Sequence, residues 1–319
     1  MKQVMFTLAV LLNAYMLSAC SINIGADRSA GHYERDAAGY GANDGVIERS
    51  LSVRPFTALE CRLPASVTYV QTNDQAPKVV LKGAPAMVER CVVDVRDGKL
   101  QLYLVQKAKQ SMKRFSQSRN QLNITVYGGR LTALAVQSAC SFYAERLEMP
   151  QLALSNAGAS TIRVGRFAGQ QLTMSCSGAS STKLAGNVAK LMLNVTGASS
   201  FVANEFTTQD LKVKVSGAST AKCALQGSAG VDVSGASTLT LSGTADLFTI
   251  KCSGASSVKA ADLKAQNVVV DVAGASGVKC YAARSIKGTV GCGSLTYGGR
   301  PTSFNVERQN STASIKAVD

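Results

Sequence analysis

Two groups of basic side chains are the residues whose types and spacing could do chemistry in this sequence. The segment 106–121 has no acidic residue, and its cations are Lys107, Lys109, Lys113, Arg114 and Arg119. The second group recurs about every 20 or 40 residues, at Arg163, Lys183, Lys222, Lys259 and Lys279. Cations without neighbouring acids attract anions. Both groups are therefore candidate anion-binding residues, for which acidic glycans, lipopolysaccharide and lipid phosphates are the candidate ligands.

The charge of the whole chain points the same way. Its 34 basic and 20 acidic residues give a formal net charge of +14, which favours anionic partners. A basic surface without a particular partner is the alternative, and the second group could equally be a solvated edge that discourages aggregation. Nucleic acid is disfavoured, because proteins that bind single strands interleave aromatic residues with their cations, and the second group has none.

Catalytic chemistry has little support in the residues. The chain has a single histidine, His32, so most acid–base catalysis would lack its usual residue. The chain has no Gly-x-Ser-x-Gly elbow, no phosphate loop and no CxxC pair, and its acids are scattered rather than paired. We predict a non-enzymatic protein with no catalytic residue, metal or cofactor. A polysaccharide-active β-helix enzyme remains an alternative.

The first twenty residues resemble a bacterial lipoprotein signal. Lys2 precedes an apolar run from Val4 to Leu17, and Leu-Ser-Ala comes directly before Cys20. A signal peptide over 1–19, lipid on Cys20 and a membrane partner through that lipid are expected. Ser21 at the next position points to the outer membrane. An ordinary cleaved signal followed by a chance cysteine is the alternative.

Four segments follow from the composition. After the signal peptide, residues 20–50 are rich in Gly, Ala and charge and predict a flexible tether. Short alternating strands with turn signals predict an N-terminal β region over 51–130. Residues 131–319 carry a repeat.

The repeat centres on Ser-Gly-Ala-Ser. Its glycines are spaced by 18 to 20 residues: Gly158, Gly178, Gly197, Gly217, Gly235, Gly254 and Gly274. Ser138 occupies the glycine slot one period earlier. Apolar residues alternate on both sides of each glycine, at positions −4, −2, +4 and +6, which is the period of a strand. A repeat of this length predicts a solenoid.

We therefore predict an all-β fold, a parallel β-helix with one coil per repeat. The coil length is not a multiple of six, which disfavours a left-handed hexapeptide helix and favours a right-handed one. The glycines are expected to form structural corners, since glycine adopts positive φ without steric cost. Ala at +1 is expected to point inward, and Ser at +2 to stack on its own kind and cap turn amides. A serine ligand-binding ladder is the alternative.

Eight cysteines follow Cys20. Cys176 and Cys252 share one repeat position, and Cys223 and Cys280 another, but each pair lies several coils apart, beyond bridging distance. These cysteines are expected to fill the interior. A bridge between Cys61 and Cys91 is left open, because the two lie on neighbouring strand candidates.

The residues also resemble a known family, the auto-transporter adhesins with a head GIN domain. The similarity rests on Arg54-Pro-Phe56, on the serial Ser-Gly-Ala-Ser coils and on Leu295 to Pro301, and covers about 50–319. It implies a β-helical fold, a surface or envelope location and a role in adhesion. The leading hypothesis is a lipid-anchored envelope protein that binds an acidic glycan, lipopolysaccharide or a protein. A purely structural envelope protein is the alternative.

Overall fold

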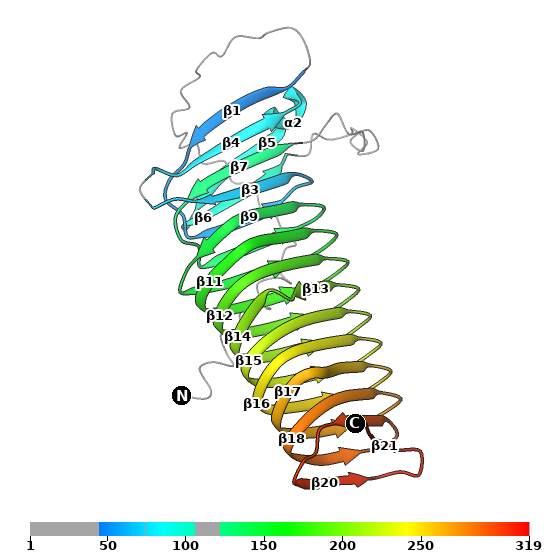
Figure 1. Ribbon diagram of the computed structural model, residues 1–319. Helices are drawn as coiled ribbons and strands as arrows, with labels where there is room; N and C mark the ends of the chain where they lie inside the picture. The colour runs from blue at the N-terminus through cyan, green and yellow to red at the C-terminus, as the bar shows by residue number, and fades with distance from the viewer. Residues whose placement is uncertain (1–44, 74, 106–121, 319) are drawn as a thin grey trace. The chain divides into compact units, whose positions relative to one another are not determined.

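The computed structural model describes residues 45–73, 75–105 and 122–318. Cys20, the signal segment, most of the tether and the basic run Lys107 to Arg119 lie outside these residues. The described part is a parallel β-solenoid of about nine turns (Figure 1), so the predicted fold class is confirmed. Strand β1 (Ile47–Ser52) begins inside the range assigned to the tether, because it pairs with β4 (Lys78–Gly83).

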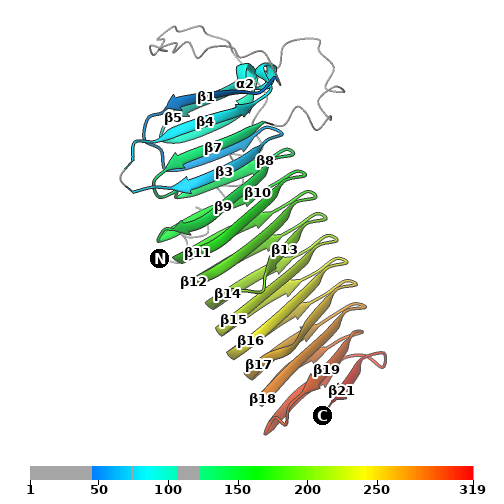
Figure 2. The same ribbon diagram turned by 45° about the horizontal axis from the view of Figure 1, so that its top comes forward.

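Each coil runs through two stacked sheets. Above the repeat lie β8 (Ala133–Gln137), β9 (Ser141–Glu148) and β10 (Gln151–Asn156), and the repeat strands follow: β11 (Thr161–Cys176), β12 (Ser181–Val195), β13 (Ser200–Ala203), β14 (Phe206–Val215), β15 (Thr220–Val233), β16 (Thr238–Cys252), β17 (Ser257–Val272) and β18 (Gly277–Val290). The last coils are β19 (Ser294–Gly298), β20 (Ser303–Arg308) and β21 (Ser314–Ala317). Most repeat strands bend from one sheet into the other, so β11 pairs with β9 in its first half and with β10 in its second. Figure 2 shows the coils stacked in register.

The motif glycines form one corner of each coil. Their φ angles lie between 65° and 79°, and Ser138 in the glycine slot has φ 70°. A Cβ on Gly217 would lie 2.5 Å from the carbonyl oxygen of Gly197 in the coil before. Both the backbone angle and the close stacking therefore require glycine, as the sequence predicted.

The arrangement of the two small residues after the glycine differs in part from the prediction. Ala at +1 is exposed in every coil. Its backbone N–H donates to the carbonyl of the motif glycine one coil earlier, as Ala218 does to Gly197 at 2.8 Å. Ser at +2 is buried and stacks in register from coil to coil, as predicted, with Ser180 donating to the Ser199 hydroxyl at 3.2 Å. In the other coils the hydroxyl donates to a carbonyl of the preceding coil rather than capping an amide, as Ser219 does to Gly197 at 3.2 Å. The in–out alternation continues through the corner, so +2 joins −2 and +4 inside.

The apolar core lies between the two sheets. All residues at −4, −2, +4 and +6 are buried, from Leu154 in the first coil to Cys280 in the last. Cys176, Cys223, Cys252 and Cys280 are among them as free thiols, as predicted. Burial raises the pKa of Cys223 and Cys280 to about 12, so both thiols stay protonated and unreactive.

The N-terminal end is closed by a cap. Strand β4 leads through α2 (Pro85–Arg90), which buries Met87 and Val88, into β5 (Cys91–Arg96). Antiparallel pairing occurs only in this part of the described chain, between β1 and β4, β4 and β7 (Asn123–Gly128), and β5 and β6 (Lys99–Leu104).

One coil lies out of sequence order. Strand β2 (Ala58–Arg62) pairs in parallel with both β6 and β8, and β3 (Ser66–Gln71) pairs in parallel with both β7 and β9. The first coil of the sequence is therefore inserted between two later ones, visible in Figure 1 as β3 lying between β7 and β9. Folding of this layer requires contacts that are distant in the sequence.

Replacing a corner glycine should destabilise the solenoid. We expect Gly217→Ala to lower the free energy of unfolding by about 2 kcal/mol or more, because the new Cβ meets backbone at a positive φ. Gly230→Ala is the matched control, since its Cβ would meet nothing within 4 Å, and it should change stability by less than about 0.5 kcal/mol. Urea unfolding measures both, and equal effects would contradict the corner argument.

Candidate functional site

The second group of basic residues forms one row on the outside of the solenoid. The strand registers place the following residues next to one another on successive coils: Thr68, Tyr143, Arg163, Lys183, Val202, Lys222, Thr240, Lys259, Lys279, Thr296 and Lys316. We call these the basic row. Its six cations are exposed, and it contains no acid. None of the six forms an ion pair with another described residue.

A row of hydroxyls lies beside the basic row on the same sheet. Two residues earlier in each strand stand Ser66, Ser141, Thr161, Ser181, Ser200, Thr220, Thr238, Ser257, Gly277, Ser294 and Ser314. All but Gly277 carry a hydroxyl that can donate and accept hydrogen bonds. The two rows together present cations flanked by neutral polar groups, repeated about every 4.8 Å.

The opposite sheet has a different charge pattern. Lys214, Asp232, Lys251 and Asp271 are neighbours in register and alternate in sign. Alternating charges on neighbouring strands stabilise pairing. The charges of this row therefore balance, unlike those of the basic row.

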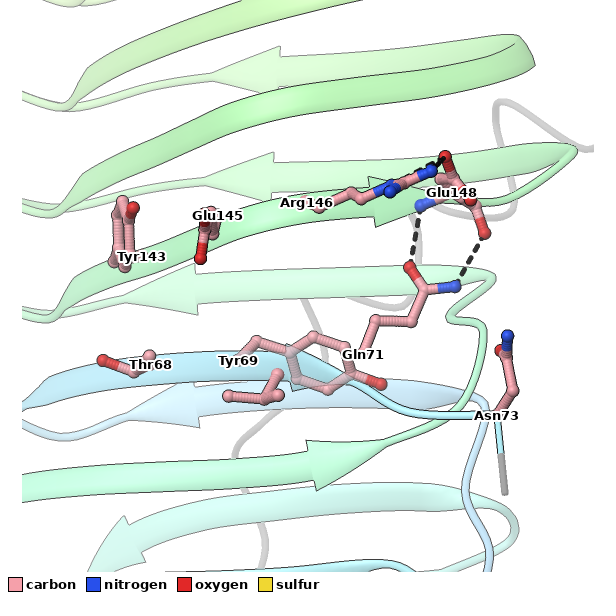
Figure 3. A pocket seen from close by; sticks show the side chains of 9 residues that line it. Thr68, Tyr69, Gln71, Asn73, Tyr143, Glu145, Arg146 and Glu148 are labelled. Carbon is pink, nitrogen blue, oxygen red and sulfur yellow. Dashed lines mark hydrogen bonds and ion pairs between the residues drawn. The ribbon is translucent and has the colours of Figure 1, made fainter. Parts of the chain in front are cut away.

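An open groove of about 450 Å³ lies at the N-terminal end of the basic row (Figure 3). Strand β3 contributes Thr68, Tyr69, Val70, Gln71 and nearby Asn73, and strand β9 contributes Tyr143, Glu145, Arg146 and Glu148. The ring of Tyr143 is 46% exposed, so it offers a flat surface with a polar end. Since Thr68 and Tyr143 also belong to the basic row, the groove is continuous with it.

Side-chain hydrogen bonds join the two strands that line the groove. The amide of Gln71 accepts from the Glu148 N–H at 2.7 Å and donates to the Glu148 carbonyl at 2.8 Å, which takes the place of a missing strand ladder. Arg146 pairs with the Glu148 carboxylate through Nε at 2.7 Å. Tyr69 is buried, its hydroxyl donates to the Gly129 carbonyl at 2.5 Å, and burial raises its pKa above the usual range. Tyr69 is therefore a neutral structural group beneath the groove.

A smaller cleft of about 100 Å³ lies further along the row, between Lys183 and the turn at Asn204-Glu205. The turn interrupts the strand between β13 and β14, and the Glu205 carbonyl accepts from the Gly186 N–H at 3.0 Å. Acidic Glu205 lies at its edge, so the cleft is less positive than the rest of the row.

The described part of the chain contains no cluster of three or more His, Cys, Asp or Glu side chains that could hold a metal ion. Within the same residues, no helix is long and apolar enough to span a membrane.

The structure brings together all five repeat cations predicted as anion-binding. The sequence reasoning missed that Tyr143 and Lys316 extend the row, although both follow from the repeat: Tyr143 is the +5 residue of the coil with Ser138 in its glycine slot. It also missed the groove, because Gln71 and Glu148 lie far apart in the sequence and outside the repeat.

A family model described as "Putative auto-transporter adhesin, head GIN domain" matches residues 55–238 and 226–301. The chain belongs to this family. The sequence resemblance is thereby confirmed, and the family name suggests a protein of the bacterial cell surface. No curated protein matches the chain.

Several solved structures are similar to the chain at low sequence identity. One is named a putative lipid binding protein from Parabacteroides distasonis, with 17% identity, a TM-score of 0.48, and cover of 87% of this chain and 98% of that one. Another is named a putative adhesin from Parabacteroides merdae, with 15% identity, a TM-score of 0.48 and the same cover. A third, named a putative adhesin from Bacteroides fragilis, has 20% identity and a TM-score of 0.32, with cover of 86% and 97%.

Removing the Gln71 amide should open the groove end. We expect Gln71→Ala to cost about 1–2 kcal/mol in unfolding free energy, since two backbone groups of Glu148 lose their partner. Amide hydrogen exchange at Glu148 should rise at the same time. Exposed Gln226 serves as the control, and Gln226→Ala should leave both quantities unchanged. Unaltered exchange at Glu148 in Gln71→Ala would contradict this account of the groove.

Proposed function

We propose that this protein is a cell-surface adhesin that binds linear acidic polysaccharides along the basic row. The observation that carries the proposal is the set of six exposed cations, in register and without acidic partners. Keeping like charges in line on one sheet costs some repulsion energy, and the opposite sheet of the same solenoid avoids that cost by alternating signs. A bound polyanion would remove the repulsion.

The spacing of the cations suits an extended polymer. Successive cations lie one, two, two, one and two coils apart from Arg163 to Lys316, which corresponds to steps of about 4.8 or 9.6 Å. The longer step is comparable to one disaccharide unit of an extended chain. The hydroxyl row beside it offers hydrogen bonds to sugar hydroxyls. The groove with exposed Tyr143 would receive a sugar at one end of the polymer.

We further propose that the protein is anchored in the outer membrane through lipid on Cys20. The lipoprotein-like sequence Leu-Ser-Ala-Cys and the following Ser21 support this proposal. The residues between Cys20 and β1 would then separate the solenoid from the bilayer. Several acyl chains on one cysteine give a durable anchor.

Reversing charges on the row should weaken polyanion binding. We expect Lys183→Glu, Lys222→Glu and Lys259→Glu together to weaken binding to polygalacturonate and dextran sulfate by roughly tenfold or more, and to reduce the salt dependence of what remains. Immobilised polysaccharides at two salt concentrations provide the measurement, with uncharged dextran as the blank and lipopolysaccharide vesicles as a separate arm.

Cations outside the basic row supply a matched control. Lys212→Glu, Lys264→Glu and Lys287→Glu change the net charge by the same amount at exposed positions whose register partners are not acidic, and should leave much more of the binding intact. Equal loss in both triple variants would mean attraction by net charge alone. Unchanged binding in the row variant would contradict the proposal. Binding to lipopolysaccharide but not to the polysaccharides would mean that the basic row binds lipid phosphates instead.

The anchor has its own test. Full-length protein should sediment with outer membranes, and Cys20→Ser should release it into the soluble envelope fraction, because the residue proposed to carry the lipid is lost. Metabolic labelling with an alkyne fatty acid should mark the first and not the second. Membrane association without label would contradict lipidation.

A further inference from the structure

Cys140 occupies an unusual place in the repeat. It stands at +2, the position filled by serine in the coils that follow: Ser160, Ser180, Ser199, Ser219, Ser237, Ser256 and Ser276. In three coils this serine hydroxyl reaches the carbonyl at −2 of the preceding coil, from Ser160 to Val136 at 3.3 Å, Ser256 to Val233 at 3.1 Å and Ser276 to Cys252 at 3.1 Å. In three other coils it donates to the glycine carbonyl of the preceding coil, and in two coils it also contacts the −2 side chain of its own coil, Asn156 for Ser160 and Cys252 for Ser256. A side chain at +2 therefore lies at the corner, between the −2 residue of its own coil and the −2 residue of the layer before it.

For Cys140 that neighbouring residue is Cys61. The inserted coil β2–β3 forms the layer before β8–β9, and Cys61 is paired in register with Val136, the −2 residue of the coil that contains Cys140. Both cysteines are buried, at 0% and 1% exposed. A side-chain hydrogen bond with Cys140 is the largest cause that raises the pKa of Cys61, followed by burial. The structure holds Cys61 and Cys140 as free thiols, and the register brings their side chains to the same corner of adjacent layers although they are far apart in the sequence.

Cys91 lies too far from Cys61 to form a disulfide with it. It lies on β5, which is separated from β2 by β6, and its register partner on β6 is Leu104, whereas Cys61 pairs with Leu102. Two strand spacings amount to about 9.6 Å, beyond the separation of about 7 Å that a disulfide tolerates between Cα atoms. The geometry disfavours the Cys61–Cys91 bridge that the sequence left open.

We propose that Cys61 and Cys140 form a disulfide in the exported protein, and that this bond locks the inserted coil into the solenoid. The bond would close a loop that contains the strands from β3 to β8 and, with them, the cap apart from β1. Without it, the layer β2–β3 is held between its neighbours by hydrogen bonds and packing alone. Disulfides that close long loops stabilise mainly by restricting the unfolded chain.

The oxidant is an exported dithiol–disulfide oxidoreductase in its disulfide form. One cysteine attacks as the thiolate to give a mixed disulfide, and the second displaces the enzyme sulfur. The two electrons and two protons lost by the cysteines end on the enzyme's dithiol. The raised pKa of Cys61 and the burial of both thiols make the folded, reduced pair slow to react. Bond formation therefore belongs to folding, and the pair is not a reversible switch.

Peptide mapping tests the bond directly. The full-length chain is exported in a bacterium, blocked with N-ethylmaleimide during lysis and digested without reductant. Mass spectrometry should find a peptide that links Cys61 to Cys140, while Cys223 and Cys280 become alkylated after denaturation. Alkylation of Cys61 and Cys140 after denaturation, or a link from Cys61 to Cys91, would overturn the proposal.

Stability under reductant gives an independent test. Dithiothreitol should lower the urea midpoint of the exported wild-type protein and speed its unfolding by at least about tenfold. Cys140→Ser, which restores the serine of the other coils, should show the lower midpoint without reductant and no response to it. Cys223→Ala is the control and should keep the full response. A wild-type midpoint that ignores reductant, or a Cys140→Ser variant that still responds, would refute the bond.

Discussion

The close stacking of identical corners is the constraint on which the rest of the solenoid depends. Each motif glycine lies against the backbone of the glycine one coil earlier, and the following alanine N–H bonds that glycine's carbonyl. No side chain fits between these backbones, so every coil must turn at the same place. Once the corners are aligned, the strands on either side are in register by construction. Inward positions then fall on inward positions over the whole length of the repeat.

The same register turns single outward positions into continuous rows. The residues at +5 form a line rich in cations, and those at +3 form a line of hydroxyls. The residues at −3 on the opposite sheet include a line of alternating charges. The fold does not require the cations, because Val202 and Thr240 occupy the same row without disturbing the strands. Their repetition is thus better explained by what the row contacts than by what holds the coils together.

Much of this arrangement could be predicted from the sequence, because the repeat contains it. The corner glycines, the buried positions around them and the line from Arg163 to Lys279 all follow from counting residues. The prediction that Ala at +1 points inward is wrong, because small size does not by itself indicate burial, whereas serine is buried where its hydroxyl donates a hydrogen bond to a carbonyl of the preceding coil. The inserted coil β2–β3 and the contact between Cys61 and Cys140 could not be predicted. Both depend on pairing between strands that have no repeat to align them.

The rigidity of the row bears on how it could bind. A single exposed lysine gains little from an anion in water, so six isolated cations would make a weak site. Held in line by the register, they meet successive charges of one polymer without ordering any protein segment, and each further contact is intramolecular. The number of contacts is then limited by the number of coils. The cap ends the solenoid at one side, and charged Glu307, Arg308 and Lys316 lie on the last strands at the other, where charge opposes further strand addition. The number of coils in the described solenoid would therefore limit how many successive contacts the proposed polymer could make.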